Sequence, residues 1–325
     1  MTDATKNALA LTPPTPDLAT LAPLVERAQA YAESAKASAT VRAYERDWMR
    51  FEAWCTTTRA RSLPARPATV GVYLAFLADS GKRASTIERA LAAIAHAHRA
   101  HGEEWTKGAR AIREVLGGIR RRLGVAPRKK APIVDADLRA LVGALPTGLI
   151  GVRDRALLTL AWSGAFRRSE VVALKVRDVT FSSEGVIVTL RRSKTDQEGH
   201  GTERGIPFAS DPNVCPVRAL RAWLDVGAIG DGSIFRAVSR GGRVGAALGD
   251  RAVARIVKRA AKRAGLDSDR FAGHSLRSGF ATTAAMKGRS LDAIMRQTGH
   301  RSERVARGYI RHATLFVDNA ASGLL

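Results

Sequence analysis

Four side chains near the C-terminus have the types and order that phosphate chemistry uses. His274 and Arg277 lie three residues apart, and His300 and Tyr309 follow them along the chain. Residues at i and i+3 of a helix share a face, so this imidazole and this guanidinium would point at the same object. A guanidinium offers a fixed fork of donors that matches phosphate oxygens. No acidic residue falls at a spacing that indicates a metal, so we expect a phosphoryl-transfer site built from side chains alone, without a cofactor.

This order of residues resembles the C-terminal signature of the tyrosine recombinases, or phage-type integrases, in which HxxR is followed by GH and then by a tyrosine. In the segment GAFRRSEVVAL, the resemblance assigns Arg167 as a second catalytic arginine and Glu170 as its supporting carboxylate. Arg168 is the neighbouring alternative, about 100° away on a helix. The resemblance also assigns Lys194 as a mobile lysine that protonates the leaving oxygen. It covers nearly the whole chain and is closest to the Cre-like members, although His300 stands where Cre has tryptophan.

The resemblance implies a reaction without metal or ATP. Tyr309 would attack a DNA phosphodiester, become linked to the 3′-phosphate and release a 5′-hydroxyl, and strands would be exchanged through a four-way Holliday junction. Arg167, Arg277 and His300 would bind the phosphate oxygens. His274 would act as the base near Tyr309, because imidazole titrates near neutrality whereas a phenol has a pKa of about 10.

The charge of the chain predicts a polyanionic partner. Lys and Arg number 53 against 30 Asp and Glu, giving a formal net charge of +23, and release of counterions from nucleic acid favours binding by such a protein. An acidic membrane is the competing partner. However, the sequence has no apolar run of about 18 residues and no basic amphipathic helix with a bulky apolar face. Nor does the N-terminal segment have the pattern of a signal peptide. We therefore expect double-stranded DNA with a specific target site as the partner, in the cytoplasm of a bacterium, where the bound protein is associated with the nucleoid.

The length of 325 residues is sufficient for two domains. We expect a flexible arm over residues 1–20, a helical, SAM-like core-binding domain over 21–125, a linker over 126–132 and a catalytic domain over 133–325. The predicted fold class is mostly α with a small β-sheet, in which a helical bundle is followed by an α+β tyrosine-recombinase domain. The resemblance implies that the two domains form a C-shaped clamp on DNA.

Periodicity predicts the helices of the first domain. Apolar residues recur at steps of three and four, which predicts one buried stripe made of Val41, Tyr44, Trp48, Phe51 and Trp54. A following helix is expected to have Thr69 as its N-cap and to stop at Gly81. The whole segment is expected to hold four or five helices.

In the second domain, residues 152–181 have a helical pattern. The period then changes, because Val186, Val188 and Leu190 alternate with other residues and a polar, glycine-containing tip leads to Ile206 and Phe208. This pattern predicts a β-hairpin. A third strand could precede or follow it, and the sequence does not place it. Helices are expected to resume after Cys215.

Basic residues predict the DNA contacts. A cluster at a helix N-terminus, where free N–H groups favour phosphate, consists of Lys82, Arg83, Ser85, Thr86 and Arg89. A solvated face is the alternative for any such run of charge. The other predicted contacts are Arg121, Arg122, Lys129, Lys130, Arg243, Arg251 and Arg255. Arg251, near the start of its helix, is the best candidate for reading a base edge.

Histidines and cysteines elsewhere predict no metal site. His96 and His98 would point to different sides of a helix, and no Cys or carboxylate completes a set with His101. We therefore expect these histidines to pack within the bundle or lie at its surface. Cys55 and Cys215 are far apart without CxxC spacing, which is typical of reduced, buried thiols.

Each candidate residue has an ordinary structural explanation by itself, whereas the ordered set indicates an enzyme. Site-specific recombination is the favoured function, carried out by a homotetramer on two DNA sites with a dimer on each. A type IB topoisomerase is the second enzymatic possibility, and a non-catalytic DNA-binding protein is the third. The apolar tail, which includes Leu315 and Phe316, would close its own domain or dock on a neighbouring protomer.

Overall fold

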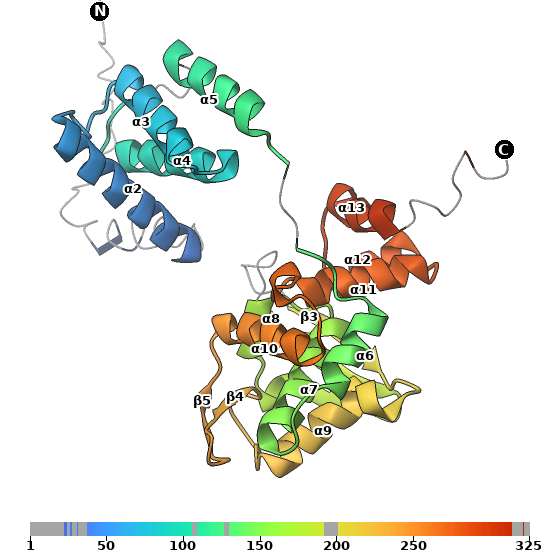
Figure 1. Cartoon of the computed structure of the whole chain (residues 1–325). Coiled ribbons are helices and arrows are strands. Elements are labelled where there is room, and N and C mark those ends of the chain that lie inside the picture. The colour runs from blue at the N-terminus through green and yellow to red at the C-terminus, as the bar shows by residue number, and fades with distance from the viewer. Residues whose placement is uncertain are drawn as a thin grey trace, which may run out of the picture. The chain divides into compact units, whose positions relative to one another are not determined.

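The computed structural model describes residues 38–105, 109–126, 130–191 and 201–313, together with Pro23, Leu24, Arg27, Tyr31 and Ala321. The chain divides into two compact units, Met1–Pro127 (unit 1) and Arg128–Leu325 (unit 2), which are labelled by element in Figure 1. Among the described helices, none combines the length and the apolar character needed to cross a membrane. Each unit has its own hydrophobic core, so each is considered separately.

The described part of unit 1 is helical. Its helices are α2 (Ser38–Thr58), α3 (Pro67–Asp79), α4 (Ala84–Ala100) and α5 (Arg110–Leu123). The predicted stripe on α2 supplies Phe51, which is fully buried, with Trp48 and Trp54 packed at the edge of the core. Helix α2 packs on α4, and α3 packs on α5. The resulting core holds Tyr73, Ile87 and Ile112.

The predicted N-cap of α3 is wrong. The helix begins at Pro67, two residues before Thr69, and it ends at Asp79. Proline suits the first helical position, because its φ is already near the helical value and its missing N–H would have had no intrahelical partner. Thr69 therefore lies inside the first turn. Gly81 follows the helix with a positive φ of 71°, in agreement with the predicted stop.

The histidines of α4 serve packing. His98 is buried, accepts a hydrogen bond from the Ala65 N–H at Nε2 (2.8 Å), and has Nδ1 2.8 Å from the Ile94 carbonyl oxygen. The ring of His96 lies against Tyr44, with centroids 5.5 Å apart. Within the described residues, no group of three or more His, Cys, Asp or Glu side chains is arranged to hold a metal ion. The packing interpretation is confirmed for His96 and His98.

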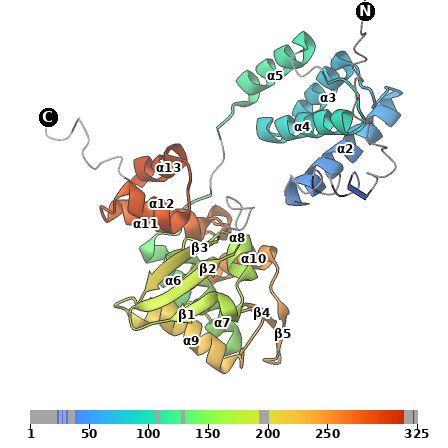
Figure 2. The ribbon, with the colours of Figure 1, turned by 180° about the vertical axis from the view of Figure 1, so that it is seen from behind.

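Unit 2 contains both helices and strands. Its helices are α6 (Asp135–Gly143), α7 (Leu149–Ser163), α8 (Arg168–Ala173), α9 (Pro216–Val226), α10 (Asp250–Arg263), α11 (Ser275–Met286), α12 (Leu291–Thr298) and α13 (Glu303–Ala313). Helices α7 and α9 pack together over a core that includes Leu157, Phe166, Trp223 and Ile256. Helices α11, α12 and α13 gather at one end of the unit, beside β3 (Figures 1 and 2).

The predicted hairpin is confirmed, and the third strand precedes it. Strands β2 (Gly185–Leu190) and β3 (Thr202–Pro207) are antiparallel, with Val186 opposite Ile206, and β1 (Val179–Phe181) pairs with the other edge of β2 (Figure 2). The helical prediction for 152–181 is therefore wrong at its end, because α8 stops at Ala173 and the chain enters β1. The ladder with β2, a contact that local periodicity does not report, determines this strand. Phe208 lies past β3 and is 36% exposed.

A second, two-stranded sheet was not predicted. Strands β4 (Arg236–Val238) and β5 (Val244–Ala247) pair antiparallel just before α10. Both strands are short, at three and four residues, so they offer little alternation to detect.

Helix α11 is seated closely against the chain that precedes α6. The Ile133 N–H donates to the Ser275 carbonyl oxygen (2.9 Å). A Cβ at Gly279 would lie 1.7 Å from the Ile133 carbonyl oxygen, so glycine is needed for this approach. The same helix carries Arg277, so this backbone contact fixes the position from which the Arg277 side chain extends.

Candidate active site

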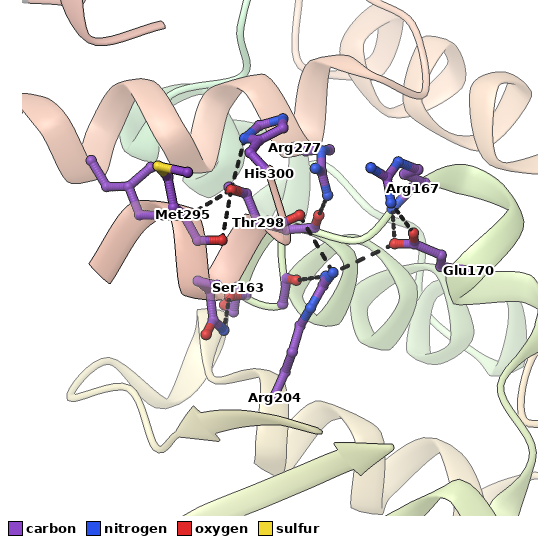
Figure 3. A network of polar contacts seen from close by, with 12 residues as sticks. Ser163, Arg167, Glu170, Arg204, Arg277, Met295, Thr298 and His300 are labelled. Atoms are coloured by element: carbon purple, nitrogen blue, oxygen red, sulfur yellow. Dashed lines mark hydrogen bonds and ion pairs between the residues drawn. The ribbon is translucent and has the colours of Figure 1, made fainter. Parts of the chain in front are cut away.

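The end of α7 and the start of α8 present one of two adjacent arginines to the site. The Arg167 main-chain N–H donates to Glu170 Oε2 (2.8 Å), and its Nη1 donates to Glu170 Oε1 (2.5 Å), as Figure 3 shows. The Glu170 side chain is 2% exposed and that of Arg167 is 18% exposed. Arg168 points elsewhere, is exposed and faces Asp250 at 3.7 Å. Arg167 is thus the arginine that the buried carboxylate orients.

Arg277 on α11 is buried, with 1% of its surface exposed. Its Nη1 donates to the Ala165 carbonyl oxygen (2.7 Å), whereas its Nη2 has no hydrogen-bond partner among the described residues. Burial, and next the nearby charge of Arg167, lower the pKa of Arg277 to about 10, so it remains a cation at neutral pH. A buried cation with an unused donor is suited to bind an anion, since leaving the donor unpaired is costly.

Tyr309 on α13 lies between two histidines. Its hydroxyl is 2.9 Å from Nε2 of His274, at the N-terminus of α11. On the other side, its ring stacks on that of His300, with centroids 5.6 Å apart and an interplanar angle of 20°. The start of α11, the end of α12 and α13 therefore bring these side chains together.

The pKa shifts place the proton on the phenol and leave the imidazole neutral. Burial raises the pKa of Tyr309, against the opposing effect of Arg277 and Arg167. Burial, followed by the charges of Arg277 and Arg167, lowers the pKa of His274. At neutral pH the phenol is therefore protonated, and a neutral imidazole nitrogen lies within hydrogen-bond distance of it.

His300 follows the C-terminus of α12. Gly299 caps this helix in the left-handed conformation with φ 64°, which turns the chain so that His300 Nδ1 lies 2.8 Å from the Thr298 hydroxyl. Burial, and then the charges of Arg277 and Arg167, lower the pKa of His300 to about 4. The ring is therefore neutral at neutral pH, and one of its nitrogens is already engaged with Thr298.

The predicted DNA contacts of unit 1 other than Arg89 lie at helix ends. Arg83 is the N-cap residue of α4, and Lys82, Arg83 and Ser85 are exposed there, with Thr86 partly buried. Arg89 is engaged within the unit, because its Nε donates to the buried Asp47 at 2.7 Å. Exposed positions at the end of α5 are occupied by Arg121 and Arg122.

In unit 2, the predicted DNA contacts are Arg243 in the turn between β4 and β5, and Arg251 and Arg255 on the exposed side of α10. Lys130 is exposed, and its Nζ donates to the Asp269 carbonyl oxygen. Two predicted residues, Lys129 and Lys194, lie outside the described residues.

One buried charge beside this site was missed by the sequence reasoning. Arg204 on β3 is 4% exposed and lies in the same polar network (Figure 3). Strand alternation could have identified it, because Ile206 was assigned to the buried face of the hairpin and Arg204 is two residues before it.

Comparison with known proteins identifies the family. Residues 133–315 match the phage integrase family. The integrase/recombinase xerD homolog of Selenomonas ruminantium is 42% identical over 293 residues, covering 89% of this chain and 86% of that protein. XerC of Xanthomonas axonopodis pv. citri, a tyrosine recombinase, is 34% identical over 177 residues, covering 54% of this chain and 52% of that protein. The recombinase cre of Escherichia phage P1 is 24% identical, covering 80% of each chain.

Solved structures share the fold. A lambda integrase dimer bound to a COC′ core site aligns with a TM-score of 0.58 at 18% identity, covering 88% of this chain and 75% of that chain. XerH bound to palindromic difH substrate aligns with a TM-score of 0.54 at 17% identity, covering 77% of this chain and 68% of that chain. The predicted fold class, mostly α with a small β-sheet, is confirmed, and the second sheet is an addition to it. The chain belongs to the phage integrase family and is a tyrosine recombinase, an enzyme of site-specific DNA recombination.

Proposed function

We propose that Tyr309 is the nucleophile of this recombinase. Its oxygen forms a bond to the phosphorus of a DNA phosphodiester while the bond from phosphorus to the 5′-oxygen breaks, which leaves a 3′-phosphotyrosine and a free 5′-hydroxyl. The phenolic proton passes to Nε2 of His274, which lies 2.9 Å away. The departing oxygen takes a proton from Lys194, as the family resemblance implies.

Arg167, Arg277 and His300 are the proposed phosphate ligands. Attack places negative charge on the non-bridging oxygens, and preorganised donors in a partly buried site stabilise that charge more than water does. Nη2 of Arg277, which has no hydrogen-bond partner among the described residues, supports this role, as does the orientation of Arg167 by Glu170. His300 takes part by donating one further hydrogen bond.

The covalent intermediate keeps the energy of the phosphodiester bond. The 5′-hydroxyl of another strand can attack the phosphotyrosine, so rejoining needs no ATP. Two such exchanges pass through a Holliday junction. The proposed assembly is a homotetramer on two double-stranded DNA sites, with a dimer on each site, acting on nucleoid DNA in the bacterial cytoplasm.

Both units are proposed to contact DNA. The exposed Lys82, Arg83 and Ser85 at the start of α4 are suited to phosphate or groove contacts. Arg251 is exposed in the first turn of α10 and is suited to read a guanine edge. The XerH structure in the comparison is described as a post-cleavage complex with its difH substrate, which supports a duplex DNA partner here.

The contact between Tyr309 and His274 carries this proposal, and a trapping experiment tests it. The full chain is incubated with duplexes that have a random core and a nick next to it, so that the short 5′-hydroxyl fragment diffuses away and cleavage cannot reverse. Protein-linked DNA is recovered after denaturation and sequenced. We expect one enriched sequence linked through its 3′ end. Linkage through a 5′ end, or no linkage to any sequence, would contradict the proposal.

The type IB topoisomerase alternative receives no support from the comparisons, whose named relatives are recombinases. Plasmids with one or two copies of the enriched sequence separate the two activities. A recombinase deletes or inverts the segment between two copies, whereas a topoisomerase relaxes both plasmids equally.

A further inference from the structure

Arg204 is a charged residue in a position that ordinarily holds an apolar one. Strand β3 alternates between exposed and buried side chains, and the alternation that buries Ile206 also buries Arg204. The Arg204 side chain is 4% exposed. A cation so far from water needs partners inside the protein.

The guanidinium of Arg204 finds these partners in three segments. Its Nη1 donates to the Gly164 carbonyl oxygen (2.6 Å) and lies 3.9 Å from Glu170 Oε2. Its Nη2 donates to the Thr298 carbonyl oxygen at 3.4 Å. The guanidinium also lies over the Phe166 ring, 5.0 Å from its centroid. Figure 3 shows Arg204 reaching up from the sheet between α8 and the end of α12.

Two of these partners directly hold proposed phosphate ligands. Glu170 accepts hydrogen bonds from the main chain and side chain of Arg167. Thr298 has its hydroxyl 2.8 Å from His300 Nδ1. One buried guanidinium therefore connects the support of Arg167 to the support of His300.

The turn that precedes Arg167 is also held by side chains from distant segments. Three successive carbonyl oxygens of this turn accept hydrogen bonds from side chains of three different elements. The carbonyl oxygens of Ser163, Gly164 and Ala165 accept from Gln297, Arg204 and Arg277 at 2.9, 2.6 and 2.7 Å. Ala165 has a φ of 48°, a left-handed conformation that is strained for alanine and persists where surrounding contacts hold it. Loss of Arg204 would remove one of those contacts.

We propose that Arg204 is a positioning residue for recombination, which fixes Arg167 and His300 relative to each other without touching the DNA phosphate. The inference rests on the proposed function, because that function assigns Arg167 and His300 to the phosphate. Direct contact with DNA does not fit Arg204, since its side chain is buried and both of its terminal nitrogens donate within the protein.

The test compares Arg204→Met, Arg204→Lys and a control, Arg221→Met. Arg221 also lies over an aromatic ring, Phe181 at 4.7 Å, but it is exposed and outside the network. Three quantities are measured on the full chain: the single-turnover rate of covalent complex formation on the trapped DNA sequence, the affinity for that DNA, and the pKa of His300 from its ring NMR signals. The His300 signals are assigned with a His300→Asn variant.

We expect Arg204→Met to form the covalent complex about 100-fold more slowly, the scale expected for loss of one transition-state donor. DNA affinity should change by less than about threefold, because Arg204 does not touch the DNA. A tenfold change would correspond to about 1.4 kcal/mol. The His300 pKa should rise, because the charge of Arg204 contributes, after burial, Arg277, Arg167 and His274, to lowering it. Arg204→Lys keeps the charge but not the fork, so it should keep the low His300 pKa and recover part of the rate. Arg221→Met should match the unmodified chain.

A purely structural role predicts a different result. The folded fraction of Arg204→Met would then cleave at the unmodified rate with an unchanged His300 pKa, which would overturn the inference. A loss confined to DNA affinity would also overturn it, since it would indicate direct contact with DNA. If Arg204→Met does not fold, Arg204→Lys carries the same comparison of rate and affinity. If the unmodified chain links to no DNA sequence, the proposed function fails, and the His300 pKa still tests whether Arg204 acts on that side chain.

Discussion

The hydroxyl of Tyr309 lies 2.9 Å from Nε2 of His274, although the two residues are 35 positions apart in sequence. The pKa of the phenol is raised by burial, and the pKa of the imidazole is lowered by burial and by nearby arginines. The pair therefore consists of a protonated nucleophile and a neutral base at neutral pH, which is the starting state that attack on a phosphate requires.

Replacement of His274 by Gln should remove the acid limb of the pH profile. Only the neutral imidazole can accept the Tyr309 proton, and the pKa of His274 is lowered from the ordinary 6.5. Cleavage by the unmodified chain should therefore fall when the pH drops below this lowered pKa. His274→Gln should be slower by about 100-fold or more and should lack this fall. The measurement is the second-order rate of covalent complex formation against pH. His101→Gln, at an exposed histidine of unit 1, serves as the control. An unchanged acid limb in His274→Gln would assign the proton transfer to another group.

Replacement of Arg277 by Lys should separate catalysis from binding. Lysine keeps the positive charge but cannot donate to the Ala165 carbonyl oxygen and to a phosphate from one rigid fork. We expect the cleavage rate to fall by about 100- to 1,000-fold while DNA affinity stays nearly constant. Single-turnover cleavage and DNA titration measure the two quantities. The same change at the exposed Arg296 should affect neither, and an Arg277→Lys protein of full activity would refute the proposed role.

Replacement of Glu170 by Gln should destabilise unit 2. The Glu170 carboxylate is 2% exposed and lies between Arg167 and Arg204, so its loss leaves two guanidinium groups without their buried counter-charge. The free energy of unfolding should fall by about 3 kcal/mol, as measured by urea denaturation. Glu303→Gln breaks the exposed pair with Arg307 and should change it by less than about 1 kcal/mol. Equal effects of the two variants would show that burial of Glu170 is unimportant.

His300 should make the stability of the chain depend on pH. Its pKa is about 4 in the folded protein against an ordinary value of 6.5, so in the window between these values the unfolded chain binds a proton that the folded chain does not. The free energy of unfolding should therefore decrease as pH falls through this window. The lowered pKa of His274 acts in the same direction. Urea midpoints across the window should vary less in His300→Asn than in the unmodified chain, and parallel curves would contradict the shift.

Local patterns in the sequence predicted the hairpin, because Val186, Val188 and Ile206 alternate with exposed residues. They did not predict β1, whose residues pair with β2 through contacts that periodicity does not report. Thr69 has the hydroxyl that is typical of an N-cap, but the helix begins at Pro67, whose fixed φ suits the first turn. Short-range signals therefore identified most elements, whereas their ends depended on tertiary contacts.

In the candidate site, too, the sequence indicated the residues but not the contacts that orient them. Motif order indicated Arg167, and the structure distinguishes it from Arg168 through the buried Glu170. Arg204 was missed because a charged residue in a strand is ordinarily read as solvent-facing, and its burial depends on partners in α8 and α12. The contacts that orient a site come from distant segments, so sequence order alone does not reveal them.

Mapping the DNA-linked residue is the most direct test that Tyr309 is the nucleophile. Tyr309 is the one tyrosine of the four in the chain that lies in unit 2. Covalent complexes trapped on nicked duplex are digested with trypsin, and the nucleotide-bearing peptide is identified by mass spectrometry. We predict that the nucleotide is carried by the peptide spanning Gly308 to Arg311, that Tyr309→Phe binds DNA with unchanged affinity and forms no adduct, and that Tyr44→Phe behaves as the unmodified chain. An adduct on any other peptide, or one that persists in Tyr309→Phe, would contradict the account.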